Sequence, residues 1–213
     1  MRILHVTSAV GVGGAEMALL VLVRHQVHTG HQVEVAHVRG DTGMGEAFRE
    51  AGARVTFLGA EQAWRLPMAL YRLCRVMRDR RPDLVHTHLL KADLLGAAAA
   101  RRLGLTHRLV SSKHNDEAAL RHAPVQWAHR IISGWAARVV ALSSHVGEIV
   151  AVDGGVPRDR LEVVAYGLDP APFEAAGGDG IRAELGLVDD DVVALTVARF
   201  APQKDHAGLL RAA

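Results

Sequence analysis

Residues 2–24 constrain the fold more than any other stretch of the chain. Residues 2–7 form an apolar run typical of a buried strand, residues 8–14 are small and rich in glycine, and residues 15–24 have the composition of a helix. A strand, a Gly-rich turn and a helix in this order open a nucleotide-binding α/β domain. The N-terminus of such a helix favours an anion, and Gly13 and Gly14 have no Cβ to hold a phosphate or a sugar hydroxyl away from the backbone. We therefore predict a ligand at Gly13 and Gly14, the alternative being a tight turn that binds nothing.

The turn departs from the dinucleotide-binding fingerprint. The pattern G-x-G-x-x-G needs a third glycine where this chain has Glu16. The strand expected at residues 31–38 also ends without the acidic residue that would bind the ribose of a nicotinamide cofactor. Both departures argue against NAD. Glu16 would lie in the first helical turn, where it either contacts an acceptor hydroxyl or stabilises the helix start.

Strand and helix patterns alternate as far as residue 165. Strands are expected at residues 2–7, 31–38, 54–58, 82–88, 106–113, 138–142 and 161–165, with helices between them. This alternation predicts an α/β fold in which a mostly parallel sheet carries helices on both faces. Ligands of such sheets bind outside the carboxyl ends of the strands, so the residues that follow the strands should form one rim.

The chain changes character near residue 170. Residues 175–180 resemble a linker, and a buried strand at 192–197, a loop and a helix at 206–213 would open a second unit. One strand and one helix cannot bury a sheet face by themselves. We therefore predict a Rossmann-like N-terminal domain at residues 1–172, followed at residues 173–213 by a linker and the start of a truncated second domain.

Composition narrows the class of protein. The net charge of +2 is too small to indicate a nucleic-acid partner. The single cysteine, Cys74, excludes an internal disulfide and fits a reducing compartment. No apolar run reaches the length of a membrane span, and we expect no signal peptide, because Met1 and Arg2 lead directly into the first expected strand. We expect a cytoplasmic protein, with peripheral contact with the inner face of the cell membrane as a further option.

That option rests on the helix expected at residues 64–81. It carries an apolar stripe of Leu66, Leu70, Leu73 and Met77 and several arginines on its other sides. A basic amphipathic helix can lie on an anionic membrane. More often the stripe packs on the core and the arginines are solvated, and we interpret it in that way.

Two cations stand in the loop before the last expected helix. Arg199 and Lys204 flank a turn that contains Pro202, so both can converge on one anion. Arginine forks onto phosphate oxygens, and lysine adds a point charge. The diphosphate of a sugar donor carries such charge, which grows on the leaving group as the glycosyl bond breaks. The alternative is a pair of solvated surface cations.

Histidines follow or end two of the expected strands. His86 and His88 are two residues apart and should share a face, but two ligands without a cysteine or carboxylate do not predict a metal site. We interpret His88 as a rim residue. His114 stands between Lys113 and Asn115, and a polar cluster at the end of a strand suits sugar hydroxyls.

Taken in order, these motifs resemble the retaining glycosyltransferases of the GT-B fold, family-four type. The matching segments are Ile3-Leu-His-Val6 with Gly13-Gly-Ala-Glu16, residues 81–88 (RPDLVHTH), Ser112-Lys-His114, residues 139–144 (VVALSS), residues 161–169 (LEVVAYGLD) and residues 196–205 (TVARFAPQKD). They cover essentially the whole chain. The resemblance implies an enzyme that moves a sugar from a nucleoside diphosphate sugar to an acceptor hydroxyl with retention of configuration.

The resemblance also implies roles for the donor-side residues. Arg199 and Lys204 match the pair that holds the donor diphosphate on the C-terminal domain, in place of a metal ion. Gly13 and Gly14 match the glycines near the reacting sugar and phosphate. His114 matches the histidine near the transferred sugar, so His114, Arg199 and Lys204 are the expected catalytic residues. No metal or cofactor is expected.

The acceptor side is assigned to the N-terminal domain by the same resemblance. Glu16, His88 and Asn115 are the candidates for acceptor contacts, and the acceptor is a sugar or a lipid-linked compound.

The chain departs from the family at two points. Tyr166 stands where the family has an asparagine before the glycine, and the family's paired-glutamate motif would lie beyond residue 213. We therefore expect the chain by itself to be inactive. A non-catalytic sugar- or nucleotide-binding module and a sugar-nucleotide epimerase of related architecture remain the alternatives.

Overall fold

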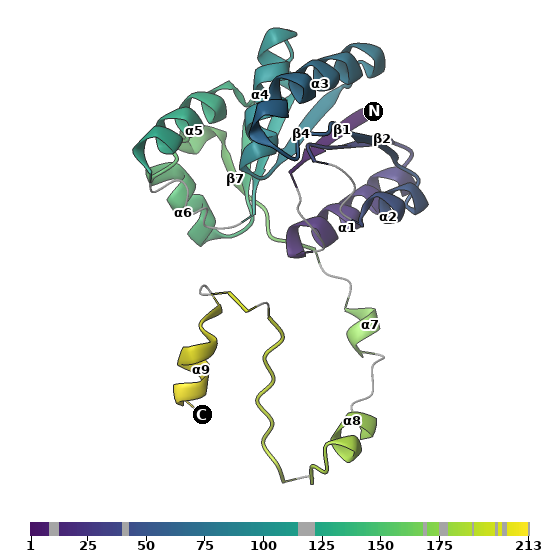
Figure 1. Ribbon diagram of the computed structural model, residues 1–213, viewed down its shortest axis with the longest axis vertical. Coiled ribbons are helices and arrows are strands. Elements are labelled where there is room, and N and C mark those ends of the chain that lie inside the picture. Colours follow the sequence, from purple (N-terminus) through teal and green to yellow (C-terminus); the bar gives the residue numbers. More distant parts are fainter. Residues whose placement is uncertain are drawn as a thin grey trace. The chain divides into compact units, whose positions relative to one another are not determined.

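The computed structural model describes residues 1–8, 13–39, 43–114, 122–167, 170–174, 179–188, 190–198, 200–201 and 204–212. The chain divides into two compact units, residues 1–168 and residues 169–213 (Figure 1).

A seven-stranded parallel sheet forms the centre of the first unit. Its strands are β1 (Arg2–Thr7), β2 (Gln32–His37), β3 (Arg54–Phe57), β4 (Leu84–His88), β5 (Leu109–Lys113), β6 (Arg138–Ala141) and β7 (Leu161–Val163). They lie in the order β3-β2-β1-β4-β5-β6-β7. The chain moves outward from β1 to β3 and then crosses back to β4, so the order reverses between β1 and β4. Ligands of open parallel sheets bind beside such a reversal, at the carboxyl ends of the strands.

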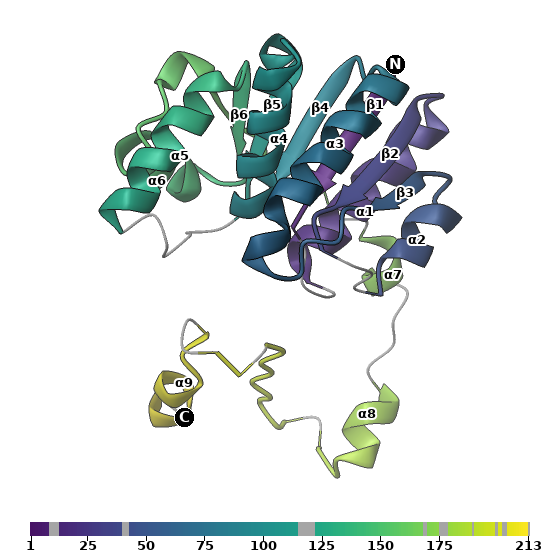
Figure 2. The same ribbon diagram turned by 45° about the horizontal axis from the view of Figure 1, so that its top comes forward.

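Helices cover both faces of the sheet, as the alternating pattern predicted (Figure 2). One face carries α1 (Gly14–His28) and α2 (Gly45–Glu50), and the other carries α3 (Leu66–Arg80), α4 (Leu90–Arg102), α5 (Ala123–Trp135) and α6 (Ser144–Val152). Short 3₁₀ turns, η1 (Ala63–Arg65), η2 (Thr106–Arg108) and η4 (Arg158–Arg160), precede α3, β5 and β7. The helices change face where the strand order reverses, because each parallel crossover is right-handed.

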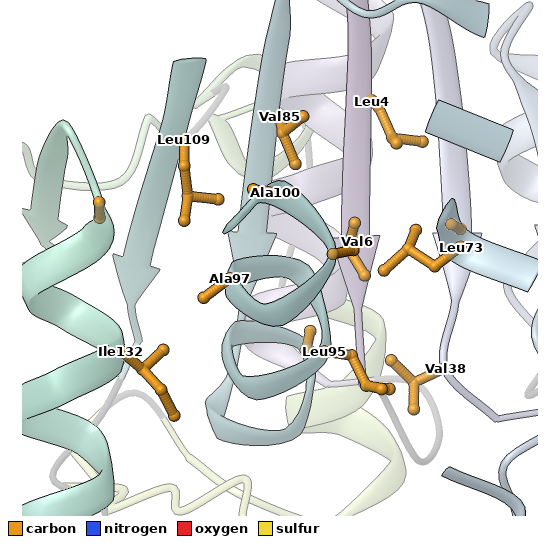
Figure 3. Close-up of a cluster of buried hydrophobic side chains, with 14 of the residues drawn as sticks. Leu4, Val6, Val38, Leu73, Val85, Leu95, Ala97, Ala100, Leu109 and Ile132 are labelled. Atoms are coloured by element: carbon orange, nitrogen blue, oxygen red, sulfur yellow. The ribbon is translucent and has the colours of Figure 1, made fainter. Parts of the chain in front are cut away.

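The larger of the two cores lies beneath α3, α4, α5 and α6. Figure 3 shows Leu4 and Val6 of β1 facing the same way as Val85 and Leu109, towards side chains of α3, α4 and α5. Alternate residues of the strands supply this core because successive strand side chains point to opposite faces. Leu73 and Met77 of α3 are buried in it, so the apolar stripe of that helix is core, as predicted.

The smaller core lies beneath α1 and α2. It contains Leu19, Leu20 and Val23 of α1, packed with side chains of β2 and with Phe48 of α2. The start of α6 is capped by Ser143, whose hydroxyl accepts a hydrogen bond from the Val146 N–H at 3.2 Å.

The second unit contains α7 (Ala171–Glu174), α8 (Asp179–Glu184) and α9 (His206–Ala212) in its described part. The helix predicted near residue 206 is present, but the buried strand predicted at residues 192–197 is wrong. These residues belong to no sheet, and Val192 and Val197 are 99% and 88% exposed. A strand needs a hydrogen-bonded neighbour, and its apolar side chains need a surface to cover them.

Among the described helices of both units, none combines the length and apolar composition needed to cross a bilayer.

Candidate functional site

Four polar side chains of neighbouring strands share the α1 face of the sheet. In the registers of the sheet, His5 of β1 pairs with His86 of β4, and His86 pairs with Val110 of β5. His88 therefore stands on the same face as His86, and Ser112 accompanies it on β5. The parallel order β1-β4-β5 brings these residues together although they come from distant parts of the sequence.

A continuous hydrogen-bonded chain runs through this cluster, and we call it the histidine chain. Its members are Gln26, His5, His88, His114 and Tyr166. His5 Nε2 lies 2.8 Å from Gln26 Oε1, and His5 Nδ1 lies 3.0 Å from His88 Nε2. His88 Nδ1 lies 3.0 Å from His114 Nε2, and His114 Nδ1 lies 2.5 Å from the Tyr166 hydroxyl. The chain thus runs from α1 through the interior to the segment after β7.

Burial keeps these imidazoles neutral. It lowers the pKa of His5 to about 4 and that of His114 to about 4, with a further lowering of the His114 pKa by the charge of Lys113. For His88, burial and then the neighbouring histidines hold the pKa well below its usual value. At neutral pH, each ring therefore has one N–H donor and one lone pair.

Tyr166 closes the outer end of the histidine chain. Its side chain is 43% exposed. Burial of its hydroxyl, and then the charge of Glu16, raise the Tyr166 pKa to about 12, so the phenol keeps its proton. The hydroxyl can therefore donate to His114 and still accept a hydrogen bond from a ligand.

A cavity of about 410 Å³ lies beside the histidine chain. Its polar lining includes His86, His88 and His114, and α1 contributes Leu19 and Leu22. Most of the remaining lining is aliphatic and comes from further residues of α1, from Val140 and Leu142 at the end of β6, and from the segment 164–167 after β7. An apolar cavity with a few convergent polar groups is the usual form of a small-molecule site.

The start of α1 is organised around Glu16. A Cβ added to Gly13 would lie 2.8 Å from Glu16 Oε2, whereas one added to Gly14 would meet nothing within 4 Å. The carboxylate of Glu16, which is buried, therefore folds back towards Gly13 and supplies negative charge at the helix N-terminus. A side chain at position 13 would displace the end of the Glu16 side chain, whereas the backbone is open at Gly14.

On the opposite face of the same strands lies a second polar group, which we call the charged cluster. Lys113 Nζ lies 2.5 Å from Asp93 Oδ2, and the Ser111 hydroxyl donates to Asp93 Oδ1 at 2.6 Å. The Thr87 hydroxyl also donates to Asp93. All four residues are buried. The cluster ties α4 to the ends of β4 and β5 and so holds the backbone that carries His88 and His114.

The ring nitrogens of His5, His86 and His88 lie within 4.8 Å of one another, which is close enough to hold a metal ion. His5 and His88, however, already use both ring nitrogens in the histidine chain. A metal ion needs a free lone pair from each ligand, so it could bind only by breaking that chain.

Comparison with known proteins identifies the family. Residues 12–172 match Glycosyltransferase Family 4. The chain belongs to this family. It is 30% identical over 140 residues to the D-inositol 3-phosphate glycosyltransferase of Acidothermus cellulolyticus, an alignment that covers 62% of this chain and 31% of that protein.

Solved structures share the fold. The Anabaena protein HepE, solved in complex with UDP-glucose, superposes with a TM-score of 0.77 at 20% identity, covering all of this chain and 57% of HepE. A UDP-N-acetylglucosamine 2-epimerase from Rickettsia bellii superposes with a TM-score of 0.56 at 16% identity, covering 88% of this chain and 52% of the epimerase. The family 4 chain described here therefore spans about a third to a half of the length of these proteins.

The structure brings together several of the predicted site residues of this family 4 chain. His88 and His114 are hydrogen-bonded to each other, and Glu16 lies close enough to Tyr166 to raise its pKa. Lys204 belongs to the second unit and is exposed. Arg199 and Asn115 lie outside the described residues.

Sequence reasoning missed two partners within the histidine chain. His5 sits in an apolar strand and Gln26 on a helix, and neither belongs to a polar motif. The alternation of side chains along the strand could have indicated His5, because His5 shares its strand face with Ile3 and Thr7. That face packs under α1. Tyr166 was singled out as a departure from the family's asparagine, and its hydroxyl is the group that bonds His114.

Proposed function

We propose that this family 4 chain is part of an enzyme that transfers a sugar from a nucleoside diphosphate sugar to an acceptor hydroxyl with retention of configuration. The observation that carries the proposal is His114, a neutral imidazole held at the carboxyl edge of the sheet beside the cavity. A neutral ring can hydrogen-bond a sugar hydroxyl without adding charge to the site. Family membership supports the reaction class.

The donor diphosphate is assigned to Arg199 and Lys204. Negative charge develops on the leaving diphosphate as the glycosyl bond breaks, and two converging cations would stabilise it without a metal ion. Gly14, the open position at the start of α1, would let the sugar or the phosphate approach the backbone. HepE was solved with UDP and with UDP-glucose, so uridine diphosphate sugars are the first donors to test.

The acceptor is assigned to the first unit. Glu16 is the candidate to contact the acceptor hydroxyl, together with Asn115, whereas His88 is buried with both nitrogens engaged and would act through His114. The largely aliphatic lining of the cavity supports an acceptor with an apolar portion, such as a sugar on a lipid carrier.

The test uses the longest natural protein that contains this sequence. Its unfolding is measured against a panel of sugar nucleotides, and a donor at about a hundred times its dissociation constant should add about 2.7 kcal/mol of stability. A protein that responds to none of the panel is not a sugar-nucleotide enzyme. The anomeric configuration of the product, read by NMR, separates retention from inversion.

Lys204→Ala provides the matched variant. Loss of a charge-assisted hydrogen bond to the diphosphate should lower kcat/KM by about ten- to a hundredfold. Because Lys204 is exposed, the free energy of unfolding should change by less than about 0.5 kcal/mol. A variant that loses stability but not turnover would remove Lys204 from the site.

An epimerase is the second candidate, since sugar-nucleotide epimerases share the fold at TM-scores of 0.56 and 0.60. A transferase needs an acceptor, whereas an epimerase does not. Release of an epimerised or free sugar without any added acceptor would favour the epimerase, whereas strict dependence on an acceptor would favour the transferase.

Peripheral membrane contact is supported by the solvent side of α3 and η1. Trp64, Met68 and Tyr71 are 72%, 54% and 60% exposed and recur at helical spacing, and Arg75 continues the same row. The Arg65 guanidinium lies 4.8 Å from the centre of the Trp64 ring. An aromatic and apolar row bordered by arginines complements the surface of an anionic bilayer. We propose that an anionic bilayer surface binds this side of α3.

Co-sedimentation with vesicles tests this contact. Binding should be stronger to vesicles of phosphatidylcholine with phosphatidylglycerol than to phosphatidylcholine alone, and Trp64→Ala should weaken it. Trp127→Ala is the matched control, because Trp127 is 67% exposed on α5. Equal loss in both variants, or a concentration-dependent dimer in place of vesicle binding, would contradict the proposal.

A further inference from the structure

We propose that Gln26 is a positioning residue whose amide oxygen, acting through His5 and His88, determines which ring nitrogen of His114 carries the proton. The inference rests on the proposed function for its role in sugar recognition. Its geometry stands independently of that function. None of the motifs in the sequence points to Gln26, which is half-buried on α1.

The hydrogen bonds of the histidine chain leave no ring nitrogen unused. Each of the three imidazoles in the histidine chain uses both ring nitrogens, at separations of 2.5 to 3.0 Å. A neutral imidazole has one N–H and one lone pair. Every link therefore needs a donor on one side and an acceptor on the other, and the choice made at one link determines the next.

Gln26 sets donor and acceptor at the buried end of the histidine chain, where it bonds His5. Its Oε1 can only accept, so His5 carries its proton on Nε2 and leaves Nδ1 as a lone pair. His88 must then donate from Nε2 to His5 Nδ1, which leaves His88 Nδ1 as an acceptor. His114 in turn donates from Nε2 to His88 Nδ1. The lone pair of His114 is thereby placed on Nδ1, where the Tyr166 hydroxyl donates to it.

Burial preserves this order. His5 and His88 are 0% and 3% exposed, so water has little access to the inner links. The lowered pKa values of His5, His88 and His114 keep all three rings neutral, since a second proton would leave two donors facing each other. Within the described part of the chain, the charged groups that act on His114 and Tyr166 are Lys113 and Asp93, which pair with each other, and Glu16.

The consequence concerns recognition. His114 has a lone pair on Nδ1, to which the Tyr166 hydroxyl donates until a ligand replaces it. A sugar or acceptor hydroxyl can replace the phenol by donating to that lone pair. A phosphate or carboxylate oxygen has no proton to donate and is rejected there. His114 would therefore select a hydroxyl group and leave the diphosphate to the cations assigned above.

The test reads the tautomer directly. Long-range ¹H–¹⁵N spectra of the chain labelled with ¹⁵N-histidine, at pH 7.5, distinguish an Nε2–H ring from an Nδ1–H ring. The signals are assigned from His5→Asn, His88→Asn and His114→Asn spectra. We expect the Nε2–H form for His5, His88 and His114. Nδ1–H forms would mean that the Gln26 amide points the other way and that the direction of the chain is reversed, which would overturn the proposal.

Three variants test control by Gln26. Gln26→Glu keeps an acceptor and should retain the Nε2–H form of His114, whereas Gln26→Leu removes the acceptor and should give a mixture of tautomers. Gln126→Leu is the matched control, since Gln126 is also a half-buried glutamine on a helix, α5, and should change nothing. An unchanged His114 signal in a folded Gln26→Leu protein would overturn the role of Gln26. If that variant does not fold, the wild-type and Gln26→Glu spectra still decide the direction.

Kinetics of the longest natural protein separate this inference from the proposed function. Gln26→Leu should lower kcat/KM by up to about tenfold, the size of one hydrogen bond to the substrate, and Gln26→Glu should restore it. A protein with no transferase activity but with the expected tautomers would contradict the proposed function alone. A transferase with the reversed tautomers would contradict the inference alone.

Discussion

Two buried polar networks lie on opposite faces of β4 and β5, and they differ in whether their side chains carry charge. The charged cluster beneath α4 keeps a full ion pair, Lys113 with Asp93. The histidine chain beneath α1 keeps its rings neutral and satisfies them with one another. Adjacent residues of β5 face the two networks: Ser111 bonds Asp93 of the charged cluster, while Ser112 bonds His86, which lies on the same sheet face as the histidine chain. A buried charge demands a fixed partner, whereas a neutral ring can exchange one, so only the second network suits a ligand.

The largest expected effect comes from breaking the ion pair. Asp93→Ala leaves the Lys113 ammonium buried without its partner and should lower the free energy of unfolding by about 3–5 kcal/mol, as measured by urea denaturation. The double variant Asp93→Leu with Lys113→Met removes both charges and should recover most of that loss. A loss below about 1 kcal/mol in Asp93→Ala would show that the ion pair does not hold α4 to the ends of β4 and β5.

Acid should unfold the protein through its neutral histidines. Burial first, and for His129 then the charge of Lys113, lower the pKa values of His5, His114 and His129 to about 4 in the folded state. The unfolded chain protonates histidine near pH 6.5, so it binds more protons than the folded protein between about pH 6.5 and 4. Stability is therefore complete above pH 6.5 and is lost as the pH falls towards 4, by about 1.4 kcal/mol per pH unit for each such histidine.

His129→Gln provides the check on this pH dependence, because His129 lies outside the histidine chain. Urea denaturation at several pH values should give a slope lower by about 1.4 kcal/mol per pH unit in this variant. A stability that stays flat from pH 6.5 to 4 in the unaltered protein would mean that the buried rings are already protonated.

The smallest expected effects come from the adjacent serines. Ser111→Ala removes a hydrogen bond to a buried carboxylate and should cost about 1.5–3 kcal/mol, whereas Ser112→Ala removes a bond to a neutral imidazole and should cost about 0.5–1.5 kcal/mol. Both variants are compared by urea denaturation under the same conditions. The reverse order would contradict the assignment of charge to one face and neutrality to the other.

Much of the fold followed from sequence patterns. Apolar runs located all seven strands of the first unit, and the periodicity of the third helix identified Leu73 and Met77 as core. The failure was the strand predicted at residues 192–197. Its pattern, VVALTV, was read correctly as apolar, but a pattern cannot supply the neighbouring strand that an extended segment needs.

In the candidate site, the sequence motifs identified the histidines at the strand ends but not the residues within the strand and helix that bond to them. His88 and His114 end or follow strands, where parallel sheets place ligands, and so they could be singled out. His5 and Gln26 lie inside regular elements, and their pairing depends on the order in which the strands are arranged. The prediction that a ligand approaches Gly13 stays a prediction. The group that approaches in this structure is the carboxylate of Glu16.

The sequence by itself determined the elements of the first unit, their parallel arrangement and the family, because periodicity and short motifs are local properties. Only the tertiary structure decided that β1, β4 and β5 are neighbours, and therefore that His5, His88 and His114 share their protons. Hydrogen bonds between residues separated by 83 and 26 positions depend on register and strand order. Those are set when the whole sheet packs, and no local pattern in the chain records them.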